Sequence, residues 1–91
     1  MIERELYKNT NKNGVRYEYE LAKGTHIRDG LFKNWWPNGN QGTIANYSNG
    51  FKHGRFINHS SNGMVNNISL YDQGDLIGER IVFYTGLRNR N

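Results

Sequence analysis

Glycine residues recur in this chain of 91 residues at a spacing of 24, and this period limits the fold more than any other feature. Gly30, Gly54 and Gly78 make up one series. Other residues repeat at the same spacing: Gly39 and Gly63, Gly50 and Gly74, Phe32 and Phe56, Ile44 and Ile68, and Tyr47 and Tyr71. Similarity at a fixed period is typical of repeat proteins, in which each unit packs only against its neighbours.

The repeats divide one domain, residues 1–91, into consecutive units. Residues 5–14 align with residues 30–39 at a spacing of 25, so the first repeat is a degenerate copy. Terminal repeats are often atypical because they cap the array. We predict the following division: a degenerate repeat at 5–29, full repeats at 30–53 and 54–77, a partial repeat at 78–86 and a tail at 87–91.

Each repeat carries the turn signals of β-hairpins. Four Asn-Gly pairs begin at Asn13, Asn38, Asn49 and Asn62, and this dipeptide suits tight turns because both residues tolerate a positive φ. The segments between the turns are rich in aromatic and β-branched residues, which favour strands. The sequence predicts an all-β fold in which consecutive hairpin repeats form one elongated, twisted antiparallel sheet.

The composition fits a thin sheet better than a thick globule. Only 35% of the residues are hydrophobic and the mean hydropathy is −0.89, yet 13% are aromatic, which is unusual for a disordered chain. A sheet with one aromatic face and one wet face satisfies both observations. The chain has no cysteine and no apolar run of the length that a signal peptide or a membrane span needs, so we expect a cytoplasmic protein.

Residues 29–81 follow a pattern of glycine, an aromatic residue, paired aromatics, Asn-Gly, and then tyrosine and two glycines. In this pattern the chain resembles the bacterial variant of the MORN repeat, with His59 and Ser60 standing where Trp35 and Trp36 stand one repeat earlier. The resemblance implies an array of β-hairpins. Many bacterial members of that family carry the label of antitoxin component, which implies a partner protein rather than a reaction.

No residue pattern in the chain predicts catalysis. The sequence lacks cysteine and a Gly-x-Ser-x-Gly motif, and its glycines are spread at turn positions instead of leading into a helix. His53 and His59 have no third metal ligand nearby in the sequence, and Glu18 and Glu20 are expected on a solvated strand face. We therefore expect a protein that is not an enzyme and that needs neither a metal nor a cofactor.

Candidate binding residues follow from the alternation of side chains along a strand. Because Trp35 and Trp36 are adjacent, they are predicted to point to opposite faces. Tryptophan and arginine are enriched at binding hot spots, and one face combines both with a histidine. We predict a partner-binding surface from that face and the second tryptophan: Trp35, Trp36, Lys33, Arg55, Ile57, His59 and Phe83.

Three functions remain open at this point. The first is a bacterial or phage module that sequesters or inhibits a partner protein, as an antitoxin, an immunity protein or an anti-CRISPR-like inhibitor of a defence nuclease does. The second is nucleic-acid binding, favoured by a net charge of +4 and a pI near 9.6 although the basic residues form no stripe. The third is a structural role in which open sheet edges drive homodimerisation or assembly. A membrane role is not predicted, because no basic cluster or amphipathic helix is found.

Overall fold

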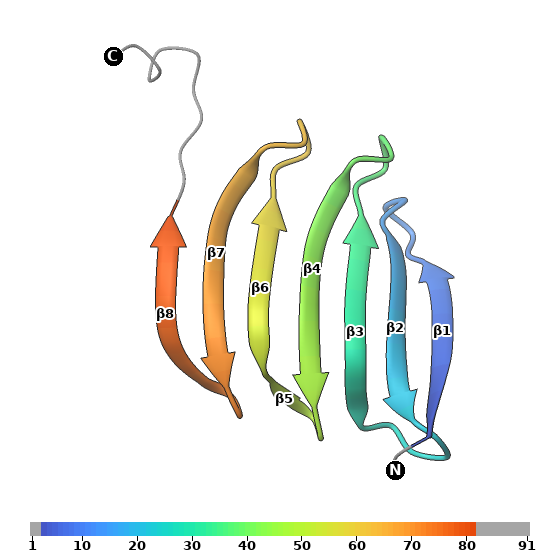
Figure 1. The fold of residues 1–91 in the computed structure, drawn as a ribbon. Helices are drawn as coiled ribbons and strands as arrows, with labels where there is room; N and C mark the ends of the chain where they lie inside the picture. The colour runs from blue at the N-terminus through green and yellow to red at the C-terminus, as the bar shows by residue number, and fades with distance from the viewer. Residues whose placement is uncertain (1–2, 82–91) are drawn as a thin grey trace.

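The chain folds as a single β-sheet (Figure 1). The computed structural model describes residues 3–81, in which all regular structure is β and no helix occurs. The eight strands are β1 (Arg4–Thr10), β2 (Arg16–Ala22), β3 (Arg28–Trp35), β4 (Gln41–Ser48), β5 (Phe51–Lys52), β6 (Gly54–His59), β7 (Val65–Asp72) and β8 (Asp75–Ile81). The predicted all-β array of consecutive hairpins is confirmed. The described residues contain no helix that is long and apolar enough to cross a membrane.

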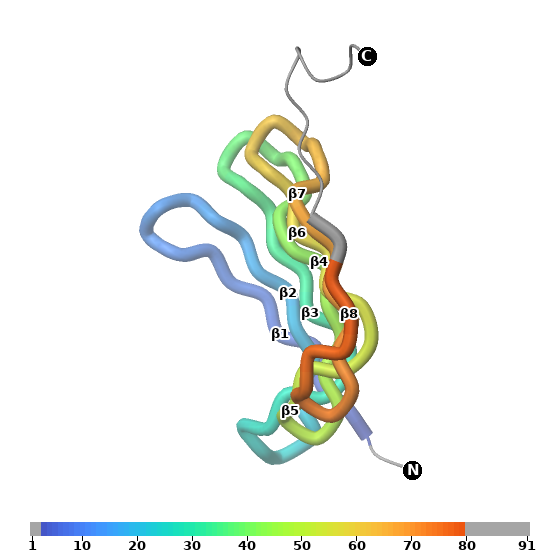
Figure 2. Tube along the Cα trace, turned by 90° about the vertical axis from the view of Figure 1, so that its left-hand side faces the viewer, coloured from blue at the N-terminus to red at the C-terminus, as the bar shows by residue number. Residues whose placement is uncertain are grey.

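Strands that follow one another in the sequence also lie side by side in the sheet. The order is β1-β2-β3-β4-β6-β7-β8, with the short β5 paired to β4, and every pair is antiparallel. Within the described residues β1 and β8 are therefore the two edges of an open sheet. Figure 2 shows that the sheet is twisted, so that the β1–β2 hairpin stands out from the later strands.

Three loops of one design lie at one end of the sheet, joining β1 to β2, β3 to β4 and β6 to β7 (Figure 1). In the middle loop the N–H of Trp36 donates to the carbonyl of Asn40 at 2.8 Å, and the N–H of Gly39 donates to the carbonyl of Trp36 at 2.9 Å. The loops at 11–15 and 60–64 contain the same pair of bonds. This is a type I turn followed by a residue with positive φ, which is why glycine is required there; the φ of Gly39 is 91°.

The tight turns at the opposite end repeat with the 24-residue period. Asn49 and Gly50 have φ values of 50° and 88°, and Gln73 and Gly74 have 49° and 94°. Turns with positive φ at both central residues match the natural twist of the strands they join. Equivalent bonds tie these turns to the preceding strand: the N–H of Gly50 to the carbonyl of Arg28, and the N–H of Gly74 to the carbonyl of Lys52, each at 2.7 Å. The sequence repeat is thus also a repeat of backbone hydrogen bonds.

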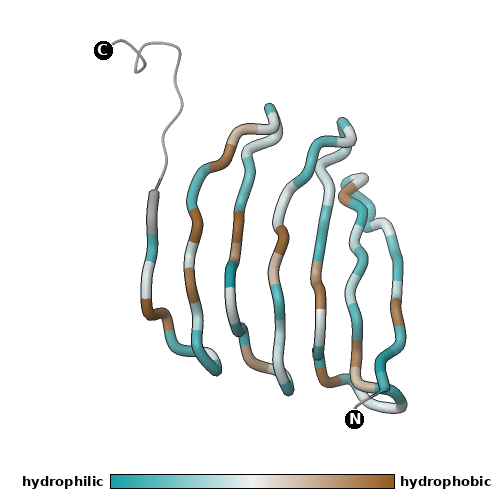
Figure 3. Tube along the Cα trace, in the orientation of Figure 1, coloured by the Kyte–Doolittle hydropathy of each residue, from teal (hydrophilic) through white to brown (hydrophobic). Residues whose placement is uncertain are grey.

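The sheet is one layer thick and has almost no buried core. Among residues 3–79, Leu21 and Ala45 are the only buried hydrophobic residues, and no large side chain is fully buried. Figure 3 shows short apolar segments separated by polar ones along the strands. Stability therefore depends on pairs of side chains on neighbouring strands, which are the stabilising units of a sheet.

Candidate protein-binding face

One face of the sheet carries a ladder of aromatic rings, and we call it the aromatic face. On the edge hairpin, Tyr7 of β1 stacks on Tyr19 of β2 with 5.8 Å between ring centroids. The ladder continues from β2 to β7 through neighbouring pairs: Tyr17–Phe32 at 6.1 Å, Phe32–Tyr47 at 6.3 Å, Tyr47–Phe56 at 5.8 Å and Phe56–Tyr71 at 5.2 Å. Such separations are typical of attractive ring pairs. The ladder is the main side-chain scaffold of this thin fold.

Two cations cover the ladder at positions 24 residues apart. The guanidinium carbon of Arg28 lies 5.1 Å from the ring centre of Phe32 and 5.3 Å from that of Tyr47. The ammonium of Lys52 lies 5.0 Å from the ring of Phe56 and also covers the next ring of the ladder. Cations placed over ring faces are attracted by the ring quadrupole. The rings of the ladder therefore pack against one another, and several of them also carry one of these two cations.

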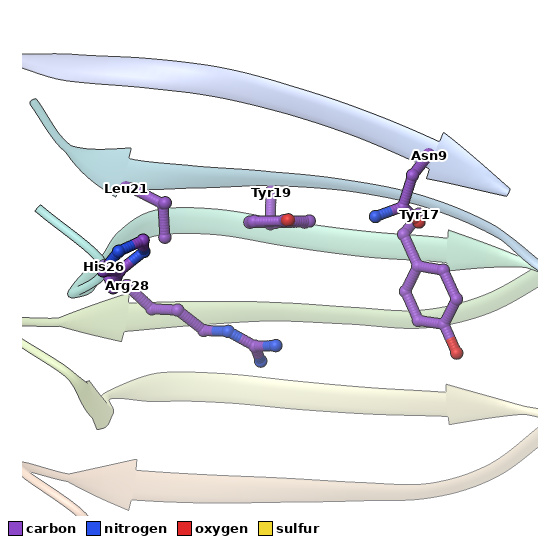
Figure 4. Close-up of a pocket in the computed structure, with 6 residues that line it drawn as sticks. All are labelled: Asn9, Tyr17, Tyr19, Leu21, His26 and Arg28. Carbon is purple, nitrogen blue, oxygen red and sulfur yellow. The ribbon is translucent and has the colours of Figure 1, made fainter. Parts of the chain in front are cut away.

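An open hollow of about 360 Å³ lies on the aromatic face near the edge hairpin. Figure 4 shows the side chains around it, with Tyr19 at its centre. The lining residues are Asn9, Tyr17, Tyr19, Leu21, His26 and Arg28. Ligand pockets bury most of a small molecule and close around it, whereas this hollow is exposed to solvent along its length. The hollow is therefore a weaker candidate for a site than the opposite face.

The opposite face carries a row of isoleucines, and we call it the aliphatic face. Ile44 of β4 is the direct partner of Ile57 of β6, and Ile57 is the direct partner of Ile68 of β7. Directly opposed residues of antiparallel strands point to the same side of the sheet. Leu31 and Leu70, each 44% exposed, lie on the same face. Five aliphatic side chains from four adjacent strands therefore share a face that no other described element covers.

Most of the predicted binding residues lie on this aliphatic face. Lys33 is the strand partner of Ile44, and Arg55, two residues before Ile57, is the partner of Leu70. Trp35, two residues after Lys33, has the guanidinium of Arg16 5.0 Å above its ring. Lys33, Trp35, Arg55 and Ile57 are thus brought together around the isoleucine row, as the alternation of strand side chains predicts.

Trp36 and His59 lie apart from this group. The indole N–H of Trp36 donates to the backbone carbonyl of His59 at 3.1 Å, which ties the β3–β4 loop to the end of β6. The Nδ1 of His59 is 2.7 Å from the carbonyl oxygen of Gly42. Both residues line a hollow of about 380 Å³ that also contains Tyr17 from the aromatic face. Phe83, the last predicted residue, lies outside the described residues.

The sequence prediction missed the aliphatic residues that dominate the face. Ile44, Ile68, Leu31 and Leu70 were not among the predicted binding residues. Ile44 and Ile68 are 24 residues apart, so the repeat already pointed to an equivalent position on two strands. Combining that period with the alternation along each strand would have placed both next to Ile57.

Asp29 is a buried acid whose partners are all structural. Its side chain is 5% exposed, and its two oxygens accept hydrogen bonds from the backbone N–H of Asn49 and from the Nε of Arg4, both at 2.8 Å. The bond from Asn49, and then that from Arg4, hold the pKa of Asp29 below its usual range because they stabilise the carboxylate. Asp29 thus joins β1, β3 and the turn after β4.

In residues 3–81 no group of three or more histidine, cysteine, aspartate or glutamate side chains could hold a metal ion together. Comparisons of the chain with protein-family models, with curated proteins and with solved structures found no match. The function is therefore inferred from the geometry of the two faces.

Proposed function

We propose that this chain is a protein-binding module that holds or blocks a partner protein through its aliphatic face. The observation that carries the proposal is the row of Ile44, Ile57 and Ile68, flanked by half-exposed leucines on an uncovered, single-layer sheet. Contiguous apolar surface with a polar border is typical of protein interaction sites. Blocking a partner requires only a complementary surface, so the proposal needs no reaction chemistry.

The charges around the isoleucine row favour a partner with an acidic surface. Lys33 and Arg55 border the row, and neither takes part in an ion pair within the described residues. On the same face, the carboxylate of Glu18 is 4.0 Å from the ammonium of Lys8, and that of Glu20 accepts the N–H of Leu31 at 2.8 Å. The acids are therefore engaged while two cations remain available. Complementary charge of this kind raises the rate and the specificity of association.

The tryptophan at the border supports the same assignment. Trp35 is half-buried and carries the Arg16 guanidinium on its ring. Tryptophan and arginine are the residues most enriched among those that dominate binding energy. A partner that covers the isoleucine row would also reach this pair, because Trp35 is only two residues from Lys33, the strand partner of Ile44.

Nucleic-acid binding is the competing function, favoured by the net charge of +4. Proteins that bind single strands without sequence preference stack bases on exposed aromatic rings. Here Arg28 and Lys52 already lie over rings of the aromatic face, and neighbouring rings pack against one another. This arrangement supports a scaffold role for the ladder and makes protein binding the better proposal.

We further propose a relationship to the bacterial MORN-repeat variant, and hence a role as an antitoxin, an immunity protein or an inhibitor of a defence nuclease. The 24-residue repeat of turn bonds at Gly50 and Gly74, and of cations at Arg28 and Lys52, supports a hairpin-repeat ancestry. In this role the chain acts stoichiometrically.

The experiment is partner capture from the native host with the unmodified chain and two matched variants. Leu70→Lys adds a charge to the aliphatic face, opposite Arg55. Leu76→Lys adds the same charge at the position that corresponds, 24 residues later, to Lys52 of the aromatic face. Both leucines are about half exposed, at 44% and 52%, so both variants should keep the fold. We expect Leu70→Lys to weaken capture at least tenfold, equivalent to about 1.4 kcal/mol, and Leu76→Lys to leave it unchanged.

Two results would contradict the proposal. One is the absence of any stoichiometric protein partner in the capture. The other is a chain that instead binds single-stranded RNA or DNA, with an affinity that falls steeply as salt increases, since that dependence is the signature of phosphate contacts.

A further inference from the structure

Strand β1 is an unusually accessible edge. Within residues 3–81 it has a neighbour on one side only, β2. Its register with β2 runs unbroken from Arg4 to Thr10, whereas the next pair, β2 with β3, contains a register shift. It contains no proline. Natural proteins usually protect an edge with a bulge, a proline, a very short strand or charged side chains, because a long regular edge is a template for another strand.

The charges of β1 are directed into its own sheet. The guanidinium of Arg4 binds buried Asp29 at 2.8 Å, and the ammonium of Lys8 is 4.0 Å from the carboxylate of Glu18. Glu5 accepts a hydrogen bond from the hydroxyl of Tyr7 at 3.1 Å. Every charged side chain of β1 therefore has an intramolecular partner, which weakens the protection that charge gives this edge.

The backbone groups that point away from β2 can be identified. The N–H of Asn11 bonds to Val15, and the N–H of Lys23 bonds to Glu3. Hydrogen-bonded and non-hydrogen-bonded pairs alternate along an antiparallel ladder. Between these two bonds, the backbone groups of every second residue therefore point toward β2 and those of the others point away from it. The outward-facing N–H and C=O groups belong to Arg4, Leu6, Lys8 and Thr10.

The aromatic ladder also ends at this edge. Tyr7 stacks on Tyr19 with one side of its ring, is 40% exposed, and is the last ring of the ladder at the β1 edge. On the other face, Leu6 is 57% exposed. A second strand placed beside β1 would cover both residues.

We propose that two copies of this chain pair through β1, antiparallel and edge to edge, with Tyr7 of one copy opposite Tyr7 of the other. In this register Leu6 stands opposite Lys8 and Arg4 opposite Thr10 of the second copy, so each outward-facing residue meets another outward-facing residue. Tyr7 then occupies a non-hydrogen-bonded position, where Cα atoms are closest, about 4.5 Å apart. The two aromatic ladders become one.

Charge selects this register over its neighbours. Side chains alternate between the two faces along a strand. One copy can therefore slide along the other only in shifts that keep each face next to the same face of the second copy. One such shift places Arg4 opposite the second copy's Lys8, and the shift in the other direction places Lys8 opposite Lys8. Directly opposed like charges are destabilising. With Tyr7 opposite Tyr7, no like charges are opposed. The aliphatic faces remain uncovered, so the dimer would present two copies of the proposed partner-binding face.

The first test uses two substitutions of opposite charge at one position, measured by sedimentation equilibrium of the purified chain over a range of concentrations. Leu6→Glu brings a carboxylate opposite Lys8 of the second copy, and Leu6→Lys brings a like charge there. We expect a reversible dimer for the unmodified chain, and a dimer dissociation constant roughly tenfold lower for Leu6→Glu than for Leu6→Lys. Within one copy Leu6 is paired with Glu20, so the monomer's own stability should change in the opposite direction.

The second test is a disulfide cross-link. Because the chain has no cysteine, an introduced cysteine is the only thiol that can react. Tyr7→Cys places two thiols at the dyad, within the Cα range that a disulfide accepts. Asn9→Cys is the matched control, because in the proposed register the two copies of residue 9 are about 13 Å apart along the strands. With oxidised glutathione, we expect the covalent dimer to form at least tenfold faster for Tyr7→Cys.

A chain that stays monomeric at all concentrations would overturn the proposal, and so would equal dimerisation of the two Leu6 variants or equal cross-linking of the two cysteine variants. Because these measurements use the purified chain alone, their outcome is independent of whether a partner protein is captured.

Discussion

The carboxylate of Asp29 accepts the backbone N–H of Asn49 at 2.8 Å, and so joins the start of β3 to the tight turn that follows β4. Asn49 has a φ of 50°, a conformation that most residues avoid. The same carboxylate also holds Arg4 of β1. One buried side chain therefore links a tight turn, an interior strand and an edge strand in a sheet that has little other core.

Replacing Asp29 should show how far the stability of the sheet depends on this single acid. We expect Asp29→Ala to lower the free energy of unfolding by about 1.5–3 kcal/mol, the usual value for hydrogen bonds to a charged group. Denaturant unfolding at neutral pH measures the change. Asp75→Asn, which alters an exposed acid, is the control and should have little effect.

The pH dependence of stability should change with the same variant. Because the pKa of Asp29 is lower in the folded chain than in the unfolded chain, its contribution is complete above the unfolded pKa of about 3.9 and is lost as the pH falls through the folded pKa. We expect the unmodified chain to lose stability below about pH 4 more steeply than Asp29→Ala does. If the free energy of unfolding fell equally steeply with pH for both proteins in acid, Asp29 would not be responsible for the loss of stability.

Gln73 occupies a turn position for which asparagine is better suited. It has a φ of 49°, and the equivalent residue one repeat earlier is Asn49. The left-handed conformation costs an ordinary residue about 1–2 kcal/mol, and asparagine less. We expect Gln73→Asn to raise the free energy of unfolding by about 0.5–1 kcal/mol and the reverse change, Asn49→Gln, to lower it by a similar amount. Two changes of the same sign in thermal unfolding would contradict this account.

The aromatic ladder should be most sensitive at its centre. Phe32 lies between Tyr17 and Tyr47 and beneath Arg28, whereas Tyr7 has one ring neighbour at the sheet edge. We expect Phe32→Ala to cost about 3 kcal/mol of stability and Tyr7→Ala about 1 kcal/mol or less. Chemical denaturation of the two variants compares them directly. Equal losses would show that the rings do not act as a connected ladder.

The adjacent tryptophans should separate stability from binding. Trp36→Phe removes the hydrogen bond to the carbonyl of His59 and should cost about 1 kcal/mol of stability while partner capture is retained. Trp35→Ala removes the ring that carries Arg16 and should weaken partner binding, with the fold kept. Circular dichroism and capture of the partner distinguish these effects. If Trp36→Phe abolished capture and Trp35→Ala did not, the binding face would be the aromatic one.

The features of this protein that depend on local rules can be predicted from its sequence. Turn chemistry placed hairpins at the Asn-Gly pairs, and the alternation of strand residues put Lys33, Trp35, Arg55 and Ile57 on one face. Both rules act over a few residues, so they can be read without knowing which strands are neighbours.

The contacts that cross between repeats become visible only in the folded sheet. Asp29 and Arg4 are 25 residues apart, and Trp36 and His59 are 23 apart, so neither contact follows from a local pattern. Their partners depend on register, which shifts between Lys33 and Trp35 and between Asn58 and His59. Each shift moves the following side chains relative to the neighbouring strand, and strand alternation alone does not encode that displacement.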